Sequence, residues 1–165
     1  MLTMNSIVIK PYTVEYQEAI ENLVLPIQQT EFGVKITREE QPDLMDIAGT
    51  FQHGVGNFWV ALDDDKVVGS IGVVDISNQQ VALKKMFVSS SHRGKDKGVA
   101  QLLMNTAMEW CSAQSVRQIF LGTTERMHAA HRFYEKNGFA EVTNSQLPPN
   151  FPIVSVDTKF YRRDL

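Results

Sequence analysis

The sequence predicts a single mixed α/β domain that extends over residues 1–165. Three observations support this fold class. The 165 residues are 43% hydrophobic and 21% charged, which suits one compact domain with a sizeable core. Segments with the alternating pattern of strands are interspersed with segments whose apolar residues recur at helical spacing. The sequence shows no internal repeat, low-complexity tract or linker long enough to divide it.

The N-terminal part predicts one strand followed by two helices. Residues Ile7–Lys10 form the expected strand, which Pro11 closes. From Thr13 onward the apolar residues take helical spacing, until Pro26 disturbs the pattern. A second short helix is expected after Pro42, because proline suits the first turn of a helix.

The middle of the sequence predicts a β-hairpin, a third strand and a long helix. In NFWVALDDDKVVGSIGVV, two runs of aromatic and β-branched residues flank the polar DDDK turn. Residues Val81–Val88 predict the neighbouring strand, and a glycine-containing loop leads from it into the helix. The apolar positions of this helix, which share one helical face, are Val99, Leu102, Leu103, Ala107 and Trp110.

The C-terminal part predicts three strands and one helix. Residues Arg117–Leu121 and Phe139–Thr143 are expected as strands, with Arg126–Lys136 as the helix between them. Gly138 suits the left-handed conformation that often follows a helix end. The last strand is expected over Ile153–Tyr161, after the turn-rich segment NSQLPPNFP.

Charge and hydropathy argue against nucleic acid and membrane partners. The formal net charge is -3 and the pI is near 5.8, so no broad basic face is expected. No apolar run approaches the roughly 20 residues of a membrane-spanning helix, and MLTMNSIVIKPY lacks the features of a signal peptide. We therefore expect a cytoplasmic protein. The single cysteine, Cys111, excludes an internal disulfide and is expected as a packed thiol on a helix.

The loop HRGKDKGVAQLL (His92–Leu103) indicates a site for a phosphate-bearing ligand. Gly94 and Gly98 stand where the helix begins, so no side chain blocks the unpaired N–H groups of its first turn. Neither GxxxxGK[ST] nor GxGxxG is present, which leaves a phosphate ligand of another kind, or an ordinary structural loop. The charged residues of the loop are Arg93, Lys95 and Lys97, with Asp96 opposing them.

Two segments together resemble the Gcn5-related N-acetyltransferase (GNAT) family. LKKMFVSSSHRGKDKGVAQLL is similar to the family's Q/RxxGxG/A loop, and AAHRFYEKNGF is similar to its later FYxKxGF helix. The resemblance spans about Asn57–Val142. It implies the GNAT fold, a mixed and mostly antiparallel sheet of six or seven strands with helices on both faces and a splayed parallel pair. Those two strands would be Val81–Val88 and Arg117–Gly122.

The resemblance implies acetyl-coenzyme A as co-substrate and no metal ion. The pantetheine arm would bond to the main chain of Met86 and Val88, and the pyrophosphate would contact N–H groups from Lys95 to Ala100. Because the loop is longer than the usual RGxGxG, either Lys95 or Arg93 fills its Q/R position. The implied cofactor-binding residues are Met86, Val88, Arg93, Gly94, Lys95, Asp96, Lys97, Gly98, Val99 and Ala100.

The implied reaction is acetyl transfer to a primary amine of a small molecule or a peptide by direct attack on the thioester. The main-chain N–H of Val88 would stabilise the oxyanion, and Tyr134 would protonate the departing thiolate. A phenol, with a reference pKa of about 10, can donate a proton at neutral pH. Helical spacing alone would make Tyr134 a core residue, so its catalytic role is implied by the family resemblance.

The general base is left open by the sequence. Many members of the family carry a glutamate on the strand before the loop, but VALKKMFV has none. Glu31, Asp75 and Glu125 are candidates, each alternatively a solvated surface carboxylate. A chain of water molecules is a further route for the proton.

The second motif departs from the family pattern at one position, and it contains two histidines that could be considered as metal ligands. Met127 stands where the family often has an asparagine that contacts pantetheine. His128 and His131 are one helical turn apart, but no carboxylate or cysteine lies at ligand spacing. We expect partly exposed helix residues here and no metal site.

Two other functions compete with the enzyme. One is a non-catalytic acyl-CoA-binding regulator on the GNAT fold, which the missing strand glutamate and Met127 both permit. The other is a phosphate-ligand binding module unrelated to acyl transfer. Tyr134 favours the enzyme. The amine acceptor and the oligomeric state stay open, with a homodimer as one option.

Overall fold

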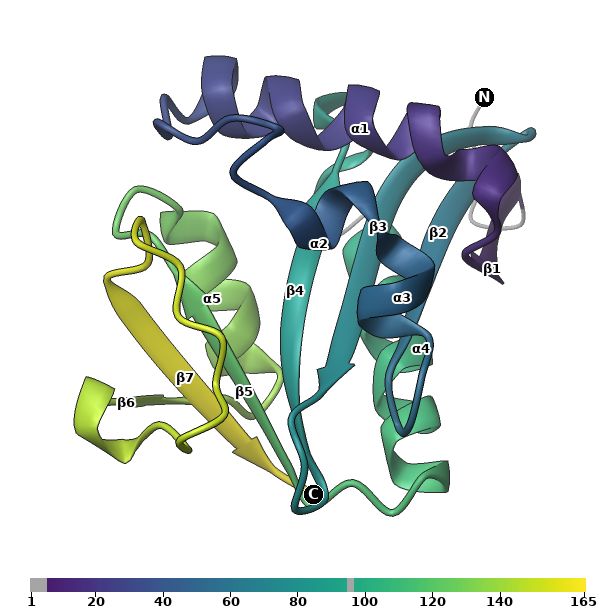
Figure 1. Ribbon diagram of the computed structural model, residues 1–165. Coiled ribbons are helices and arrows are strands. Elements are labelled where there is room, and N and C mark those ends of the chain that lie inside the picture. Colours follow the sequence, from purple (N-terminus) through teal and green to yellow (C-terminus); the bar gives the residue numbers. More distant parts are fainter. Residues whose placement is uncertain (1–5, 95–96) are drawn as a thin grey trace.

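The computed structural model describes residues 6–94 and 97–165. These residues form a seven-stranded sheet in the order β1-β2-β3-β4-β5-β7-β6 (Figure 1), in which every neighbouring pair except β4 and β5 is antiparallel. The mixed, mostly antiparallel sheet of the sequence prediction is therefore confirmed. The strands are β1 (Ile7–Pro11), β2 (Asn57–Asp63), β3 (Lys66–Asp75), β4 (Gln80–Val88), β5 (Gln118–Thr123), β6 (Ala140–Val142) and β7 (Lys159–Asp164).

The predicted hairpin is formed by β2 and β3. Asp64 and Asp65 make its turn with φ angles of 50° and 68°, a left-handed conformation that aspartate adopts more readily than most residues. Along β2, Phe58 and Val60 pack on one face of the sheet, whereas Trp59 packs on the other. Both faces of this strand are buried, which explains why it is apolar at nearly every position.

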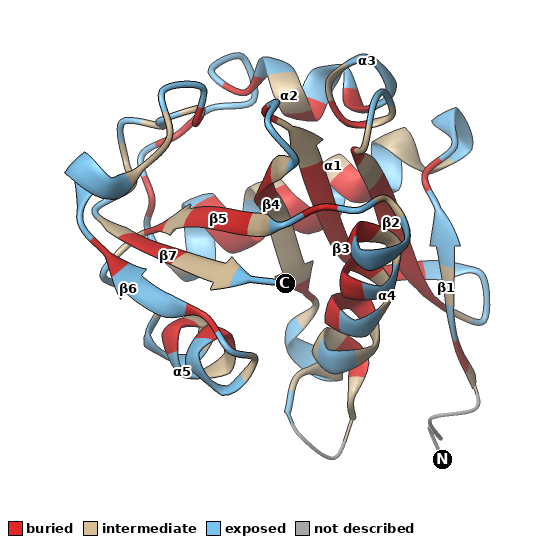
Figure 2. Cartoon of the chain, turned by 90° about the horizontal axis from the view of Figure 1, so that it is seen from below, coloured by how far each residue is buried: buried red, intermediate tan, exposed pale blue. Residues whose placement is uncertain are grey.

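Helices cover both faces of the sheet (Figures 1 and 2). On one face lie α1 (Gln17–Pro26), α2 (Pro42–Met45) and α3 (Ile47–Phe51), and on the other lie α4 (Val99–Ala113) and α5 (His128–Lys136). Among the residues that the structure describes, no helix combines the length and the apolar character needed to span a membrane.

The predicted helical stripe of α4 is buried at Val99, Leu103 and Ala107, whereas Leu102 and Trp110 are half-buried and pack against the same core. The buried residues of α4 are Val99, Leu103, Met104, Ala107, Met108 and Cys111. The expected packed thiol is confirmed, because Cys111 is fully buried and its burial raises the pKa of the thiol to about 12. The indole N–H of Trp110 donates to the carbonyl of Val55 at 2.9 Å.

The strands β4 and β5 splay apart, as the resemblance implied. They pair in parallel only at their beginning, from Gln80 opposite Gln118 to Ala82 opposite Phe120. Beyond Ala82, β4 continues beside β3, and β5 continues beside β7 (Figure 1). Among the described residues, one edge of the second half of β4 therefore has no strand partner.

Two N-terminal helices differ from the prediction. The first continues past Pro26 as a π-helical turn, Ile27–Glu31, in which the N–H of Phe32 donates to the carbonyl of Ile27 at 3.1 Å. The second helix is broken into α2 and α3 at Asp46, because the carboxylate of Asp46 accepts the N–H of Gly49 at 3.0 Å and starts a new helix.

The predicted last strand, Ile153–Tyr161, is wrong in its position. The strand β7 begins only at Lys159, where it comes into register with Thr123 at the end of β5. Pairing with β5 therefore decides where the strand lies, and residues 151–158 form a loop instead. The other C-terminal elements agree with the prediction within two residues at each end, and Gly138 has the expected positive φ of 87°.

Candidate active site

A β-bulge in β4 shapes the site. The pairing of β4 with β3 shifts its register between Ser70 and Gly72, and Lys85 at this point has a φ of 56°. The hydroxyl of buried Ser70 donates to the carbonyl of Lys85 at 2.7 Å. Because the extra residue interrupts the alternation of the strand, the consecutive side chains of Lys84 and Lys85 both reach Asp43 on α2, at 2.6 and 3.2 Å.

A cavity of about 550 Å³ lies between the end of β4, the start of α4 and α5, and we call it the helix-side cavity. This size lies within the range of small-molecule sites. The small side chains of Ala129 and Ala130 line it and leave room for a close approach to α5. The structure brings together six of the predicted cofactor-binding residues along its wall: Met86, Val88, Arg93, Gly94, Gly98 and Ala100. Lys95 and Asp96 lie outside the described residues.

The first turn of α4 offers main-chain donors beside this cavity. Gly98 precedes the helix with a left-handed φ of 69°, a conformation that favours glycine. The N–H of Leu102 is the first to reach the carbonyl of Gly98, at 3.0 Å, so the N–H groups of residues 99–101 have no partner within the helix. The N–H groups of Lys97 and Gly98 instead donate to the carbonyl of Gly94 at 3.1 and 3.2 Å. The N–H groups of Lys97 and Gly98 are therefore engaged within the loop, whereas those of residues 99–101 have no partner within α4.

The end of β4 turns the main chain of Val88 toward the helix-side cavity. The N–H of Ser89 donates to the carbonyl of Val68 on β3 at 2.8 Å. Adjacent residues of a strand direct their N–H and C=O groups to opposite edges, so those of Val88 point away from β3. The side chain of Arg93, which lines the cavity, donates from Nε to the carbonyl of Val88 at 2.8 Å, in agreement with this direction.

Arg93 links β4 to the end of the first helix. Its guanidinium pairs with Glu31, with Nη2 at 2.8 Å from Oε1, and lies 5.8 Å from the ring centre of Phe32. The hydrogen bonds and positive charge of Arg93 lower the pKa of Glu31, although partial burial opposes this. Glu31 is therefore a stable ionic partner of Arg93 and a weak proton acceptor.

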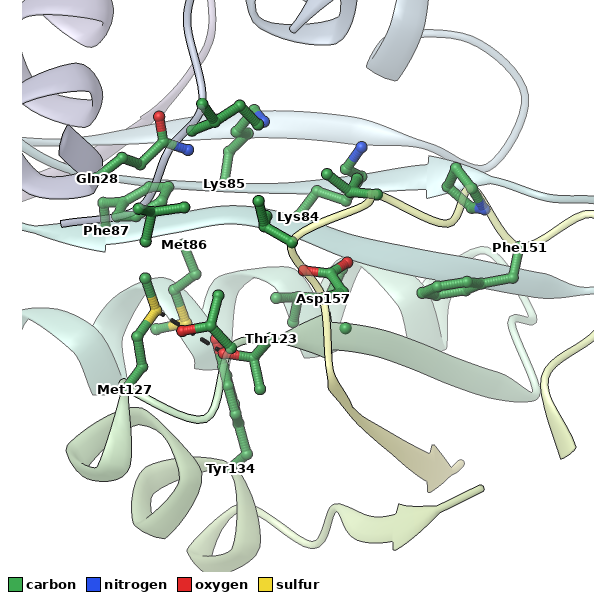
Figure 3. A pocket seen from close by; sticks show the side chains of 18 residues that line it. Gln28, Lys84, Lys85, Met86, Phe87, Thr123, Met127, Tyr134, Phe151 and Asp157 are labelled. Carbon is green, nitrogen blue, oxygen red and sulfur yellow. Dashed lines mark hydrogen bonds between the residues drawn. The ribbon is translucent and has the colours of Figure 1, made fainter. Parts of the chain in front are cut away.

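A second cavity, of about 110 Å³, lies between β4, β5 and the loop of residues 151–157, and we call it the loop-side cavity (Figure 3). It adjoins the helix-side cavity, because four residues line both: Met86, Phe87, Met127 and Tyr134. The charged side chains on its wall are Lys84, Lys85 and Asp157.

Tyr134 lies where the two cavities meet. Its side chain extends from α5 and is 7% exposed, and its ring packs edge-on against Phe139 with 5.9 Å between ring centres. Burial raises the pKa of the phenol well above its ordinary value, and the negative charge of Asp157 raises it further. The hydroxyl is therefore protonated at neutral pH and can donate to a group in either cavity.

Asp157 was not identified as a site residue from the sequence, because it falls inside the predicted last strand, Ile153–Tyr161. It follows a turn in which its N–H donates to the carbonyl of Val154 at 3.0 Å. A Cβ atom at Gly122 on β5 would lie 2.5 Å from the Asp157 carboxylate, so only glycine leaves room for it. Burial raises the pKa of Asp157 to about 6, while the positive charges of Lys84 and Lys85 oppose this rise.

The three carboxylates proposed as bases lie elsewhere. Glu31, Asp75 and Glu125 do not line the loop-side cavity, and Glu125 is exposed. Asp75 accepts main-chain N–H groups from Val55 at 3.1 Å and from Ser77 at 2.8 Å, at the end of β3. The structure does not bring any of these carboxylates to Tyr134.

Met127 and the histidine pair occupy the start of α5. The sulfur of Met127 lies 3.8 Å from the hydroxyl of Thr123, between the two cavities (Figure 3). His128 is exposed as expected, but the expected exposure of His131 is wrong, since its Nε2 lies 2.8 Å from the carbonyl of Thr124 and its ring packs near Tyr161. Within residues 6–94 and 97–165, no three histidine, cysteine or carboxylate side chains are grouped to hold a metal ion.

Comparison with known proteins identifies relatives across the whole fold. Residues 21–139 match the family model described as acetyltransferase (GNAT) family. A GNAT-family acetyltransferase of Staphylococcus aureus Mu50 is 36% identical, with a TM-score of 0.92 over 96% of this chain and 98% of that chain. An acetyltransferase of Streptococcus agalactiae 2603 is 30% identical, with a TM-score of 0.91 over 97% and 99% of the two chains.

A curated relative adds a named reaction product. The N-acetylaspartate synthetase of Xenopus tropicalis is 36% identical over 102 residues, which make up 61% of this chain. The chain spans 37% of that protein's length, and about half the length of other curated relatives that it matches.

Proposed function

Because the chain belongs to the GNAT family of acetyltransferases, we propose that it transfers an acetyl group from acetyl-coenzyme A to a primary amine of a small molecule or a peptide. The observation that carries this proposal is the position of Tyr134 on both cavities. A thioester reaching the phenol through one cavity and an amine reaching it through the other would meet beside a protonated hydroxyl.

The helix-side cavity supports acetyl-coenzyme A as the co-substrate. Its mostly apolar wall suits a pantetheine arm, and the N–H groups of residues 99–101, which have no partner within α4, suit a pyrophosphate. A pantetheine amide that bonds to Val88 would take the place of Arg93 on its carbonyl. The proposed binding residues are Met86, Val88, Arg93, Gly94, Lys97, Gly98, Val99 and Ala100, with Lys95 and Asp96 outside the described part.

The reaction requires three groups from the protein: a donor to the developing oxyanion, a proton donor to the sulfur, and a base. Bound acetyl-coenzyme A supplies a thioester carbonyl that an unprotonated amine can attack. The N–H of Val88 would then donate to the oxygen on which negative charge develops. Tyr134 would give its phenolic proton to the sulfur as the C–S bond breaks and the C–N bond remains. A base must accept the proton that the amine loses.

The name of the curated relative supports a small-molecule acceptor. N-acetylaspartate is an acetylated amino acid, and the aligned part of that protein covers 61% of this chain. The loop-side cavity, at about 110 Å³, also suits a small amine better than a folded peptide segment.

Turnover by purified protein tests this function. Acetyl-coenzyme A would be mixed with amino acids, polyamines, aminoglycosides and peptides, and free thiol would be measured. We expect at least one of these amines to release thiol. With that amine, Tyr134→Phe should lower kcat by about 100-fold or more, a typical loss for a general acid, while acetyl-coenzyme A affinity stays within a few fold.

Tyr161→Phe is the matched control. Tyr161 lies in the same aromatic cluster, 6.0 Å from Tyr134 between ring centres, but its hydroxyl donates to Glu135 at 2.9 Å. Removal of that hydroxyl should leave kcat within a few fold. Tight binding of acetyl-coenzyme A without thiol release from any amine would favour the non-catalytic regulator, and unchanged turnover in Tyr134→Phe would remove the role of the phenol.

A further inference from the structure

The loop-side cavity carries one negative and two positive side chains at a point where the family resemblance named no residue. Asp157 projects from the loop before β7, and Lys84 and Lys85 project from β4 on the opposite wall (Figure 3). The remaining wall is formed by apolar residues, threonines, Gly122 and Gln28, together with Tyr134. An occupant of this cavity therefore meets charges of both signs within reach of the phenol.

The lysine wall carries more positive than negative charge. Lys84 and Lys85 both pair with the single carboxylate of Asp43, and Lys85 also donates to Gln41 at 2.8 Å. The Lys85 side chain is 8% exposed, whereas that of Lys84 is 17% exposed. Two ammonium groups share one carboxylate, so the cluster has one positive charge in excess. Lys84 is the more accessible of the two to an anion.

Among the residues that the structure describes, Asp157 on the opposite wall has no ionic partner. It belongs to none of the ion pairs within 4.0 Å among the described residues. A partly buried carboxylate without a counter-ion is costly, and an ammonium group placed beside it would relieve that cost. The positive charges of Lys84 and Lys85 act on this carboxylate only from across the cavity.

We propose that the loop-side cavity binds a small amine that also carries a carboxylate, such as an α-amino acid, with its amino group beside Asp157 and its carboxylate beside Lys84. This assignment rests on the proposed acetyl transfer. The excess positive charge of the lysine wall attracts the carboxylate of the substrate, and the carboxylate of Asp157 binds its amino group. An amide or ester in place of the carboxylate would leave the excess positive charge of the lysine wall uncompensated.

The same placement assigns the first proton transfer. The acceptor arrives as an ammonium ion, and Asp157 takes one proton from it, which leaves a neutral nitrogen with a free electron pair. The nitrogen attacks the thioester carbonyl, the C–S bond breaks, and the thiolate takes the phenolic proton of Tyr134. The nitrogen loses its second proton to solvent, Asp157 releases its own to solvent, and Tyr134 recovers one. The net products are the amide, the thiol and one proton.

Paired substrates test the proposal. A panel of α-amino acids and their α-carboxamides would be compared as acceptors in the wild type, Lys84→Met and Lys84→Arg. In the wild type we expect kcat/KM to be roughly 10- to 100-fold higher for the acid than for its carboxamide, since the carboxamide cannot compensate the excess positive charge of the lysine wall. Lys84→Met should abolish that preference by lowering only the value for the acid, and Lys84→Arg should retain it.

Two controls keep the result interpretable. Lys66→Met removes an exposed lysine at the start of β3 and should leave kcat/KM unchanged for both the acid and the carboxamide. Acetyl-coenzyme A affinity and thermal melting would show whether Lys84→Met is folded. If Lys84→Met does not fold, the preference of Lys84→Arg for the acid over the carboxamide is still measured. Asp157→Asn should lower kcat for acids and carboxamides alike by about 100-fold, with acetyl-coenzyme A affinity unchanged.

Binding calorimetry separates this inference from the proposed function. Amino acids would be titrated into the protein saturated with coenzyme A, a measurement that needs no turnover. Binding of the acid, at least tenfold weakened by Lys84→Met, is the expected result. Equal binding of acids and carboxamides, or no binding of either, overturns the assignment even if other amines are acetylated.

Discussion

The most direct physical consequence of the loop-side cavity is that Asp157 lowers the stability of the folded protein at neutral pH. Burial raises the pKa of this carboxyl from 3.8 to about 6. The folded protein therefore binds the proton more tightly than the unfolded chain. The stabilising contribution of the protonated carboxyl is complete below pH 3.8 and is lost as the pH rises through about 6.

Asp157→Asn should remove this pH-dependent loss. A pKa that rises from 3.8 to about 6 corresponds to about 3 kcal/mol at pH 8, where both states are ionised. An asparagine has nearly the same shape and no charge to bury. The free energy of unfolding of the variant relative to the wild type should therefore increase by about 3 kcal/mol from the acid limit to pH 8, with roughly half of that increase above pH 5.

Urea unfolding of both proteins at several pH values between 5 and 8 measures the difference. Taking the difference cancels the titration of all other groups that the substitution does not touch. Asp64→Asn, in the exposed turn of the β2–β3 hairpin, removes the same charge far from the cavity and serves as control. A difference between Asp157→Asn and the wild type that is constant from pH 5 to pH 8 would refute the argument.

Three further predictions concern the loop before α4, the core and the Arg93 pair. Gly98→Asp should abolish acetyl-coenzyme A binding in calorimetry because it sets negative charge at the helix start, whereas Gly98→Asn, which tolerates the left-handed φ of 69°, should retain most of it; full binding by a folded Gly98→Asp protein would count against the phosphate site. Cys111 should resist a thiol reagent in the native protein and react only on unfolding, because the thiol is fully buried and has a pKa of about 12; fast native labelling would contradict its packing. Arg93→Gln should lower the free energy of unfolding by less than about 1 kcal/mol in urea titrations, since the pair with Glu31 is about one-third exposed; a larger loss would mean that the pair stabilises the fold.

Several parts of the fold were readable from local pattern. The hairpin has two runs of aromatic and β-branched residues around a polar turn, and α4 has apolar residues at helical spacing. Both formed as predicted, as did the strand before the loop. The left-handed conformation of Gly138 was also predicted, because glycine suits the position after a helix end, whereas that of Gly98 was not. Tyr134 was located through the family resemblance, since helical spacing alone favoured a core residue.

Other features depended on pairing between distant segments. The end of β5 fixes the start of β7, so the sequence around residue 153 could not reveal that it forms a loop. The bulge at Lys85 depends on Ser70, which lies 15 residues earlier and donates to its carbonyl. These two features set the walls of the loop-side cavity, and neither leaves a periodic signal in the sequence.

The sequence by itself determined the order of strands and helices, the glycine-rich start of α4 and the family to which the chain belongs, because local spacing and short motifs encode them. Only the tertiary structure decided that Asp157 and the lysines of β4 share a cavity with Tyr134. The physical reason is that charge and burial at this site arise between segments far apart in the chain. A carboxylate acquires its unusual environment only when β5, β4 and the loop before β7 enclose it.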